Sequence, residues 1–479
     1  MAEKFPLMIA GAASDDGILE VFAPYDGSLI GEVVAADGAA LDKALATAYA
    51  LFRNRDGWLH PSRRIEILEK AAAIMASRAE MLAVEAAREG GKPLVDSTVE
   101  VVRAIDSIKS CVETLRTESG KEIPMNLNAA SFGKIAMTHR EPIGVVVALS
   151  AFNHPLNLIA HQVGPAVATG CPVIVKPASD TPLSCMRFVR ILREAGLPNE
   201  WCQALVVKDR TLAEKLAADD RVGFLSFIGS AKVGWMLRSK LTPGARCALE
   251  HGGVAPVIVA ADADLDAAVP ALAKGGFYHA GQVCVSVQRI FAHASIAREL
   301  ARRLAAAARE QKIGDPTLPD TDVGPLIRHR ETDRVEAWVN EAVAAGAELV
   351  TGGERISEAC FPCTVLYDPP ADVKVSTREV FGPVICVYPF ERMDDAIARA
   401  NALPYAFQAA VFTRDIDTAM RCYTRLDAAA VMINEHTAFR VDWMPFAGLK
   451  HSGYNTGGIA YTMHDMQVEK MLVLKSKEL

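Results

Sequence analysis

The pattern between residues 143 and 239 constrains the fold of this chain more than any other feature. Short runs of apolar, mostly β-branched residues alternate there with segments of helical periodicity. Unbroken apolar runs are typical of strands in a parallel sheet that helices cover on both faces, and such sheets bind ligands at the carboxyl ends of their strands. The predicted strands lie at residues 143–149, 172–175, 203–207 and 222–227, and the predicted helices at residues 156–168, 182–194, 212–217 and 231–239.

A second alternation follows residue 253 and predicts a second α/β unit. Its predicted helices lie at residues 294–311, 331–345 and 394–403, and its predicted strands at residues 254–259, 384–388 and 431–433. Two further helices are predicted ahead of the first sheet, at residues 39–52 and 64–88, and two hairpin-like edge strands at residues 121–141 and 467–474. Because 479 residues are too many for one hydrophobic core, we expect two or three domains.

Composition narrows the classes of protein that this chain can belong to. With 51% hydrophobic and 23% charged residues it is expected to be globular rather than disordered. A net charge of −7 argues against a nucleic acid or an acidic lipid surface as partner. No apolar run approaches the roughly 20 residues of a membrane span, and residues 1–17 lack the apolar segment of a signal peptide. The expected compartment is the cytoplasm.

The ten cysteines are too sparse for a disulfide scaffold. Cys360 and Cys363 have the spacing of a metal-binding or redox pair, but no second pair or neighbouring histidine completes a set of four ligands. The segment also continues into a β-like run at residues 364–367. We therefore predict no metal site.

Three separated residues supply the groups needed to convert a carbonyl compound into an acid. Cys284 lies among small residues and offers a thiol nucleophile, Glu250 precedes two glycines and offers a carboxylate that can activate water, and Asn153 offers an amide that can hold an oxyanion. Taken singly, each has an ordinary alternative: a buried structural cysteine, a surface carboxylate, and a helix N-cap ahead of Pro155.

These three residues and their neighbours, in this order, resemble the aldehyde dehydrogenase superfamily over essentially the whole chain. Residues 433–445 look like the branch that contains lactaldehyde and phosphonoacetaldehyde dehydrogenases. The resemblance implies a cofactor-binding domain with a Rossmann-type parallel sheet, a second α/β catalytic domain and a small β arm that forms a homodimer or homotetramer. The implied boundaries are residues 1–122 and 144–251 for the cofactor domain, 252–446 for the catalytic domain, and 123–143 and 461–479 for the arm.

The resemblance also implies a reaction. Cys284 attacks a small aldehyde to form a thiohemiacetal, a hydride leaves to NAD or NADP, and water activated by Glu250 hydrolyses the resulting thioester. The side chain of Asn153 and the backbone N–H of Cys284 hold the oxyanion. Two alternatives from other classes stay open: a non-catalytic NAD(P)-binding structural protein, and a thiol esterase that uses the same cysteine.

The same resemblance assigns residues to the cofactor. Lys176 is expected to contact the adenosine ribose, and Ser179, three residues later, occupies a position where a glutamate would favour NAD and repel the 2′-phosphate of NADP. Serine does neither strongly, so the choice between NAD and NADP stays open. The other expected cofactor contacts are Phe152, the turn residues Gly229, Ser230 and Gly234, and the pair Glu379 and Phe381.

Expectations for the substrate rest on fewer residues. Val283, just before the nucleophile, is apolar where an enzyme that recognises an anion could place an arginine. His154 and His436 either contact a polar group of a short substrate or fill space, and a structural role is favoured for His251.

Overall fold

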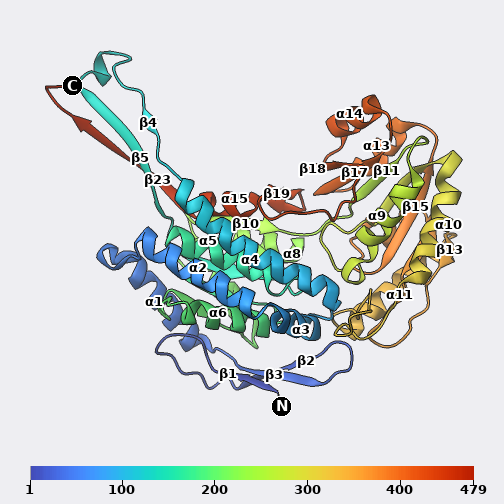
Figure 1. Ribbon diagram of the computed structural model, residues 1–479, viewed down its shortest axis with the longest axis horizontal. Helices are drawn as coiled ribbons and strands as arrows, with labels where there is room; N and C mark the ends of the chain where they lie inside the picture. The colour runs from blue at the N-terminus through green and yellow to red at the C-terminus, as the bar shows by residue number, and fades with distance from the viewer. Residues whose placement is uncertain (1) are drawn as a thin grey trace.

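The computed structural model describes residues 2–479. It contains two α/β units, each built on its own sheet, and a thin β ribbon projects from the first unit (Figure 1). The first sheet has six strands, which are all parallel except the short edge strand β21. In sheet order the strands are β21 (Gly453–Tyr454), β10 (Arg246–Glu250), β9 (Val222–Ile228), β6 (Val145–Leu149), β7 (Val173–Lys176) and β8 (Cys202–Ala204).

Helices cover both faces of this sheet, and each face has its own hydrophobic core. Helix α5 is buried along its entire length beneath α4 and α2 (Figure 1); most of its residues are apolar, and its polar side chains, such as His161 and Gln162, make hydrogen bonds. The helices of this first α/β unit are α1 (Gly38–Arg53), α2 (Pro61–Ser77), α3 (Ala79–Gly90), α4 (Leu94–Thr117), α5 (Asn157–Thr169), α6 (Leu183–Glu194), α7 (Arg210–Ala218) and α8 (Ala231–Ser239). The predicted parallel sheet with two covered faces is confirmed.

Two local predictions in this first α/β unit were wrong. The helix expected over residues 64–88 is interrupted at Arg78, which ends α2 and begins α3, so that both helices pack separately against α4. The strand expected at residues 203–207 pairs in the sheet only as far as Ala204. Leu205 N still donates to Val175 O of β7, but after Leu205 the chain leaves the sheet edge, and Val206 O accepts a hydrogen bond from the backbone N–H of Ala36.

The second sheet has seven strands, all parallel except the edge strand β13. In sheet order they are β13 (Glu348–Thr351), β14 (Thr364–Tyr367), β15 (Val384–Phe390), β12 (Arg289–His293), β11 (Pro256–Val259), β17 (Gln408–Phe412) and β18 (Ala430–Ile433). The main helices around it are α9 (Leu265–Phe277), α10 (Ala294–Glu310), α11 (His329–Ala344), α13 (Met393–Asn401) and α14 (Ile416–Arg425). The second predicted α/β unit is therefore also confirmed.

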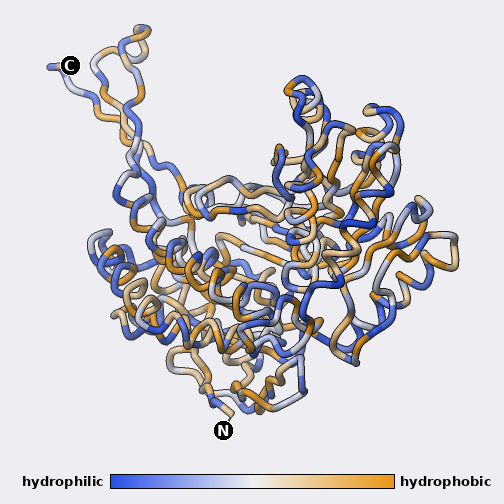
Figure 2. Tube along the Cα trace, turned by 45° about the vertical axis from the view of Figure 1, so that its right-hand side comes forward, coloured by the Kyte–Doolittle hydropathy of each residue, from blue (hydrophilic) through white to orange (hydrophobic). Residues whose placement is uncertain are grey.

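The projecting ribbon consists of β4 (Glu122–Ile123), β5 (Lys134–Pro142) and β23 (Gln467–Lys475), with β5 and β23 paired along nine residues. Apolar segments alternate with polar ones along it (Figure 2). Several of its apolar side chains are exposed to solvent: Ile135, Met137, Met471, Leu472, Val473 and Leu474. The role of this ribbon as an oligomerisation arm and the domain boundaries stay predictions.

Among residues 2–479, no helix is both long enough and apolar enough to cross a membrane. Cys360 and Cys363 are buried free thiols, and the described part of the chain contains no group of three or more His, Cys, Asp or Glu side chains arranged to hold a metal ion. The cytoplasmic location stays a prediction.

Candidate active site

A cavity of about 580 Å³ lies at the carboxyl ends of the strands of the first sheet. Its walls come from the segments that follow β6, β7, β9 and β10, from residues of the second α/β unit, and from the chain after β18. Cys284, Glu250 and Asn153 all line it, although they lie far apart in the sequence. The cavity therefore brings together the three groups proposed above for carbonyl chemistry.

Cys284 follows an unusual turn at the end of α9. His279 and Ala280 have φ angles of 48° and 53°, and Gly281 follows with 69°, so three consecutive residues occupy the left-handed region. Such conformations cost free energy and concentrate at functional sites. A side chain at Gly281 would meet the carbonyl oxygen of Gly382 at 2.1 Å, so only glycine fits there.

The thiol of Cys284 is protonated at neutral pH in this environment. Burial raises its pKa to about 12; Arg440 opposes the shift, whereas the carboxyl groups of Glu250 and Glu379 add to it. Attack on a carbonyl carbon requires the thiolate, so a base must take the proton or an added positive charge must lower the pKa.

Glu250 is the last residue of β10 and lies against the backbone of Gly457. A side chain at that glycine would meet Glu250 Oε1 at 2.2 Å. Burial raises the pKa of Glu250 above its ordinary value, and the positive charge of Arg440 opposes that shift. A carboxyl group with a raised pKa is a stronger base near neutral pH, as the activation of water requires.

The side chain of Asn153 points toward the loop that carries the nucleophile, because Asn153 Nδ2 donates a hydrogen bond of 2.9 Å to Gln282 O. The alternative of a helix N-cap is wrong: α5 begins at Asn157, and the buried carboxylate of Glu100 accepts hydrogen bonds from Leu156 N and Asn157 N instead. The second hydrogen of the Asn153 amide group is left to donate to an oxygen in the cavity.

The residues assigned to the adenosine ribose also line the cavity. Lys176 Nζ donates a hydrogen bond of 3.0 Å to Pro177 O. Burial lowers the pKa of Lys176 to about 8, and the neighbouring positive charge of Arg210 acts in the same direction. Ser179 is exposed beside them, and no sequence pattern had indicated Arg210.

The turn between β9 and α8 supplies Gly229 and Ser230 to the cavity wall. Ser230 makes no side-chain hydrogen bond to cap α8, and Val233 N donates to Ser230 O, so the amides of Ala231 and Lys232 are the ones left to meet an anion. Gly234, the third predicted contact, lies inside α8 and outside the cavity wall. A side chain there would meet His251 Nε2 at 1.9 Å, so this glycine permits helix packing rather than ligand contact.

Glu379 and Phe381 line the cavity together with Phe152. Glu379 accepts a hydrogen bond of 3.2 Å from Gly253 N, and burial raises its pKa to about 8. A side chain at Gly252 would collide with this carboxyl group, so Gly252 makes room for Glu379. The rings of Phe152 and Phe381 meet edge to face, with centroids 5.8 Å apart.

Of the three residues predicted to line a substrate, two line the cavity, and their contact with a substrate stays a prediction. His154 lines the cavity and its Nε2 lies 3.2 Å from Tyr278 Oη, while Val283 lines it within an apolar cluster. His436 is outside the cavity wall, because its Nδ1 accepts a hydrogen bond from Ala438 N and its ring packs against Gly275. His251, for which a structural role was favoured, also lines the cavity, and its Nδ1 donates to His451 O at 2.9 Å.

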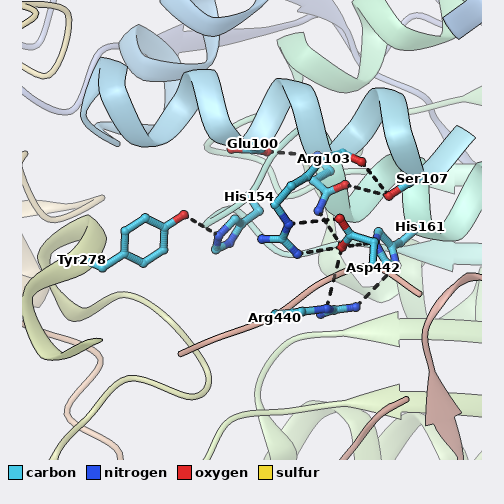
Figure 3. Close-up of polar contacts among 9 residues, drawn as sticks. Glu100, Arg103, Ser107, His154, His161, Tyr278, Arg440 and Asp442 are labelled. Atoms are coloured by element: carbon cyan, nitrogen blue, oxygen red, sulfur yellow. Dashed lines mark hydrogen bonds and ion pairs between the residues drawn. The ribbon is translucent and has the colours of Figure 1, made fainter. Parts of the chain in front are cut away.

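Sequence reasoning missed a polar cluster that centres on Asp442 and contributes Arg103 and Arg440 to the cavity wall (Figure 3). Arg103 from α4 and Arg440 from the chain after β18 both line the cavity, and both approach the carboxylate of Asp442. Arg440 and Asp442 lie within the segment that resembled a lactaldehyde dehydrogenase, but Arg103 lies 339 residues away from Asp442 in the sequence. No local pattern could have linked them.

Comparison with known proteins identifies the family. The model of the aldehyde dehydrogenase family matches residues 11–472. The chain is 36% identical to a 3-sulfolactaldehyde dehydrogenase of Priestia megaterium over 95% of this chain and 94% of that protein. It is 31% identical to a lactaldehyde dehydrogenase of Methanococcus vannielii over 95% of this chain and 97% of that protein, which confirms the resemblance to this branch.

Solved structures agree with this assignment. The crystal structure of a glyceraldehyde-3-phosphate dehydrogenase of Methanocaldococcus jannaschii complexed with NADP is 33% identical and superposes with a TM-score of 0.91, covering 96% of this chain and 100% of that one. The chain therefore belongs to the aldehyde dehydrogenase family.

Proposed function

We propose that this protein oxidises a small aldehyde to the free carboxylic acid with NAD or NADP. The observation that carries the proposal is the convergence of Cys284, Glu250 and Asn153 on one cavity. The same cavity extends to Lys176 and to the uncapped N-terminus of α8, where an elongated ligand with a pyrophosphate fits. When bound, the nicotinamide cofactor supplies the hydride acceptor.

The residues of this chain perform the remaining chemistry. The sulfur of Cys284 loses its proton and bonds to the carbonyl carbon, and the oxygen of the substrate becomes negatively charged. Asn153 Nδ2 and the backbone N–H of Cys284 donate hydrogen bonds to this oxygen. After the loss of hydride, Glu250 takes a proton from water, the water oxygen bonds to the thioester carbon, and the carbon–sulfur bond breaks to release the acid.

Absorbance of NADH or NADPH during incubation with a panel of small aldehydes, each cofactor supplied in turn, tests the proposal. Turnover with at least one aldehyde and release of one equivalent of acid per reduced cofactor are expected. A protein that binds NAD(P) but oxidises no aldehyde would instead be a non-catalytic cofactor-binding protein. Ester cleavage that needs no cofactor, without any aldehyde oxidation, would identify a thiol esterase.

Replacement of Asn153 by alanine is expected to lower kcat about 10²–10³-fold, because one of two donors to the oxyanion is lost. The rate at which iodoacetamide alkylates Cys284 should change little, since alkylation of a thiolate creates no oxyanion. Steady-state kinetics and mass spectrometry of the alkylated protein measure both quantities. A loss in kcat below about threefold would remove Asn153 from the oxyanion site.

We further propose that NADP is preferred over NAD. Lys176 and Arg210 place two positive charges around Ser179, where a 2′-phosphate would lie. Among residues 2–479 no carboxylate lies within 4 Å of either cation, since Asp180 pairs with Arg328 and Glu214 pairs with Lys240. A phosphate dianion is attracted to such a site, whereas an uncharged 2′-hydroxyl gains little from it.

Replacement of Arg210 by glutamine is therefore expected to raise the KM for NADP about 10-fold and to leave the KM for NAD unchanged. Lys208→Gln is the matched control, because Lys208 is also exposed on the same segment but does not line the cavity. Initial rates with both cofactors supply the measurement. Equal effects on NAD and NADP would contradict a contact between Arg210 and the 2′-phosphate.

We also propose that the chain forms a homodimer or homotetramer through its β ribbon. Exposed Met471 and Leu472 on β23 leave apolar surface that a second copy would cover. Light scattering gives the mass of the assembly in solution.

A further inference from the structure

Two arginines share a single carboxylate beside the nucleophile. Arg103 Nε and Nη2 donate hydrogen bonds of 3.0 and 2.7 Å to the two oxygens of Asp442, a bidentate pair. Arg440 approaches the same carboxylate more loosely, with its Nε 3.9 Å from Asp442 Oδ1. Figure 3 shows the two guanidinium groups on either side of Asp442. Both line the cavity that contains Cys284.

The other partners of Asp442 do not balance the second positive charge. His161 Nε2 lies 2.8 Å from Asp442 Oδ1, and burial lowers the pKa of His161 to about 4, so this ring is neutral at pH 7. Its Nε2 therefore donates to Asp442, and its Nδ1 accepts from Arg440 Nη2 at 3.4 Å. Two cations face one anion, which leaves one positive charge in excess.

Arg440 carries that excess charge in a form suited to binding an oxyanion. Its side chain is only 11% exposed, lies over the ring of Phe446 at 3.6 Å, and has a buried Nε without a hydrogen-bond partner among residues 2–479. Buried charges are normally paired, and the carboxylate contact of Arg440 is 3.9 Å long and shared with Arg103, so this guanidinium can take a further anionic ligand from the cavity. A guanidinium binds carboxylate, sulfonate or phosphonate oxygens in fixed geometry.

The neighbouring carboxylates do not fill this position. Glu250 attracts Arg440 but makes no ion pair with it within 4 Å among the described residues, and it is needed as the base. Glu100 is committed to a buried ion pair with Lys92 and to the amides that begin α5. Arg440 and Cys284 line the same cavity of about 580 Å³, so a substrate that reaches both of them must be small.

We propose that Arg440, held in position by the Arg103–Asp442 pair, binds a terminal anionic group of the substrate. The substrates are then short aldehydes that carry a carboxylate, sulfonate or phosphonate at the far end. This inference rests on the proposed function, since it names the substrate class of the same site. Arg440 determines specificity, and Arg103 is a positioning residue.

Alkylation of Cys284 tests the anion site without any aldehyde or cofactor. Iodoacetate and iodoacetamide attack the same sulfur and differ in the charge of one small group. The other nine cysteines are buried, so Cys284 is the thiol that reacts first. The ratio of the two alkylation rates cancels changes in the ionisation of the thiol, and it is expected to fall about 10-fold in Arg440→Met. Arg440→Lys should keep part of the preference for iodoacetate.

Matched aldehydes test the same site during turnover. Succinic semialdehyde and butanal have the same chain length and differ in a terminal carboxylate. The ratio of their kcat/KM values is expected to exceed 10² in the wild type and to fall at least about 10-fold in Arg440→Met. Arg414→Gln, in which an exposed arginine paired with Asp264 is removed, should change neither ratio.

The outcomes separate the two proposals. If both ratios are the same in Arg440→Met and wild type, Arg440 binds no anion and the inference is overturned. If the wild type oxidises no aldehyde but the alkylation ratio falls in Arg440→Met, the proposed oxidation is wrong while the anion site stands. Thermal unfolding of Arg440→Met and Arg440→Lys shows whether both variants fold, and the lysine variant alone decides the matter if the methionine variant does not.

Discussion

Replacement of Cys284 by alanine is expected to abolish aldehyde-dependent formation of NADH or NADPH, with a loss of at least about 10⁴-fold in kcat. Without the sulfur the proposed thiohemiacetal and thioester cannot form. Binding of the cofactor should change little, because Lys176, Ser179 and Glu379 are untouched. Absorbance at saturating aldehyde measures turnover, and titration calorimetry measures cofactor binding.

Cys422→Ala is the matched control for this variant. Cys422 is a buried thiol on α14 that contacts Met393 and lies outside the cavity wall, so its loss should leave turnover within about twofold of the wild type. Cys284→Ala should also remove any cofactor-independent ester cleavage, because both activities would use the same sulfur. Normal turnover in Cys284→Ala would refute covalent catalysis by this residue.

The arrangement of both sheets could be predicted because buried parallel strands leave a strong pattern. Residues 222–227 and 231–239 were predicted as strand and helix, and the structure has β9 and α8 there, since apolar burial and helical periodicity are local signals. The prediction failed where long-range contacts decide. The chain leaves the sheet after Leu205 to meet Ala36, and a helix breaks at Arg78 so that its two halves can pack on α4.

In the site, too, residues with a local sequence signal could be predicted, and residues brought together by long-range contacts could not. The sequence indicated Cys284, Glu250 and Asn153 because each lies in a short motif that resembles a family, and all three line one cavity. The space that Gly252 leaves holds the carboxyl group of Glu379, a contact that the residues around Gly252 did not indicate. The polar cluster centred on Asp442 was missed because Arg103 and Arg440 share this carboxylate only where α4 meets the chain after β18.

Replacement of Glu250 by glutamine is expected to separate the two halves of the reaction. Glutamine keeps the size of the side chain beside Gly457 but cannot take a proton from water. Steady-state turnover should fall about 10²–10⁴-fold, since general base catalysis of thioester hydrolysis is lost. The first turnover still forms the acyl enzyme, so a burst of one reduced cofactor per active site should precede the slow phase. Rapid-mixing absorbance resolves the burst, and mass spectrometry detects the acyl group on Cys284.

The pH dependence gives a second reading of the same residue. Burial raises the pKa of Glu250, so its basic form is lost as the pH falls through that raised value, and hydrolysis in the wild type should decline on the acidic side at a higher pH than an ordinary glutamate would give. Glu250→Gln should lose this acidic limb. Glu341→Gln, which removes a surface partner of Lys374, should keep it. If Glu250→Gln shows no burst and the first turnover is as slow as the later ones, Glu250 would instead be the base that deprotonates the thiol. Cys284 is protonated near neutral pH and must lose its proton before it attacks.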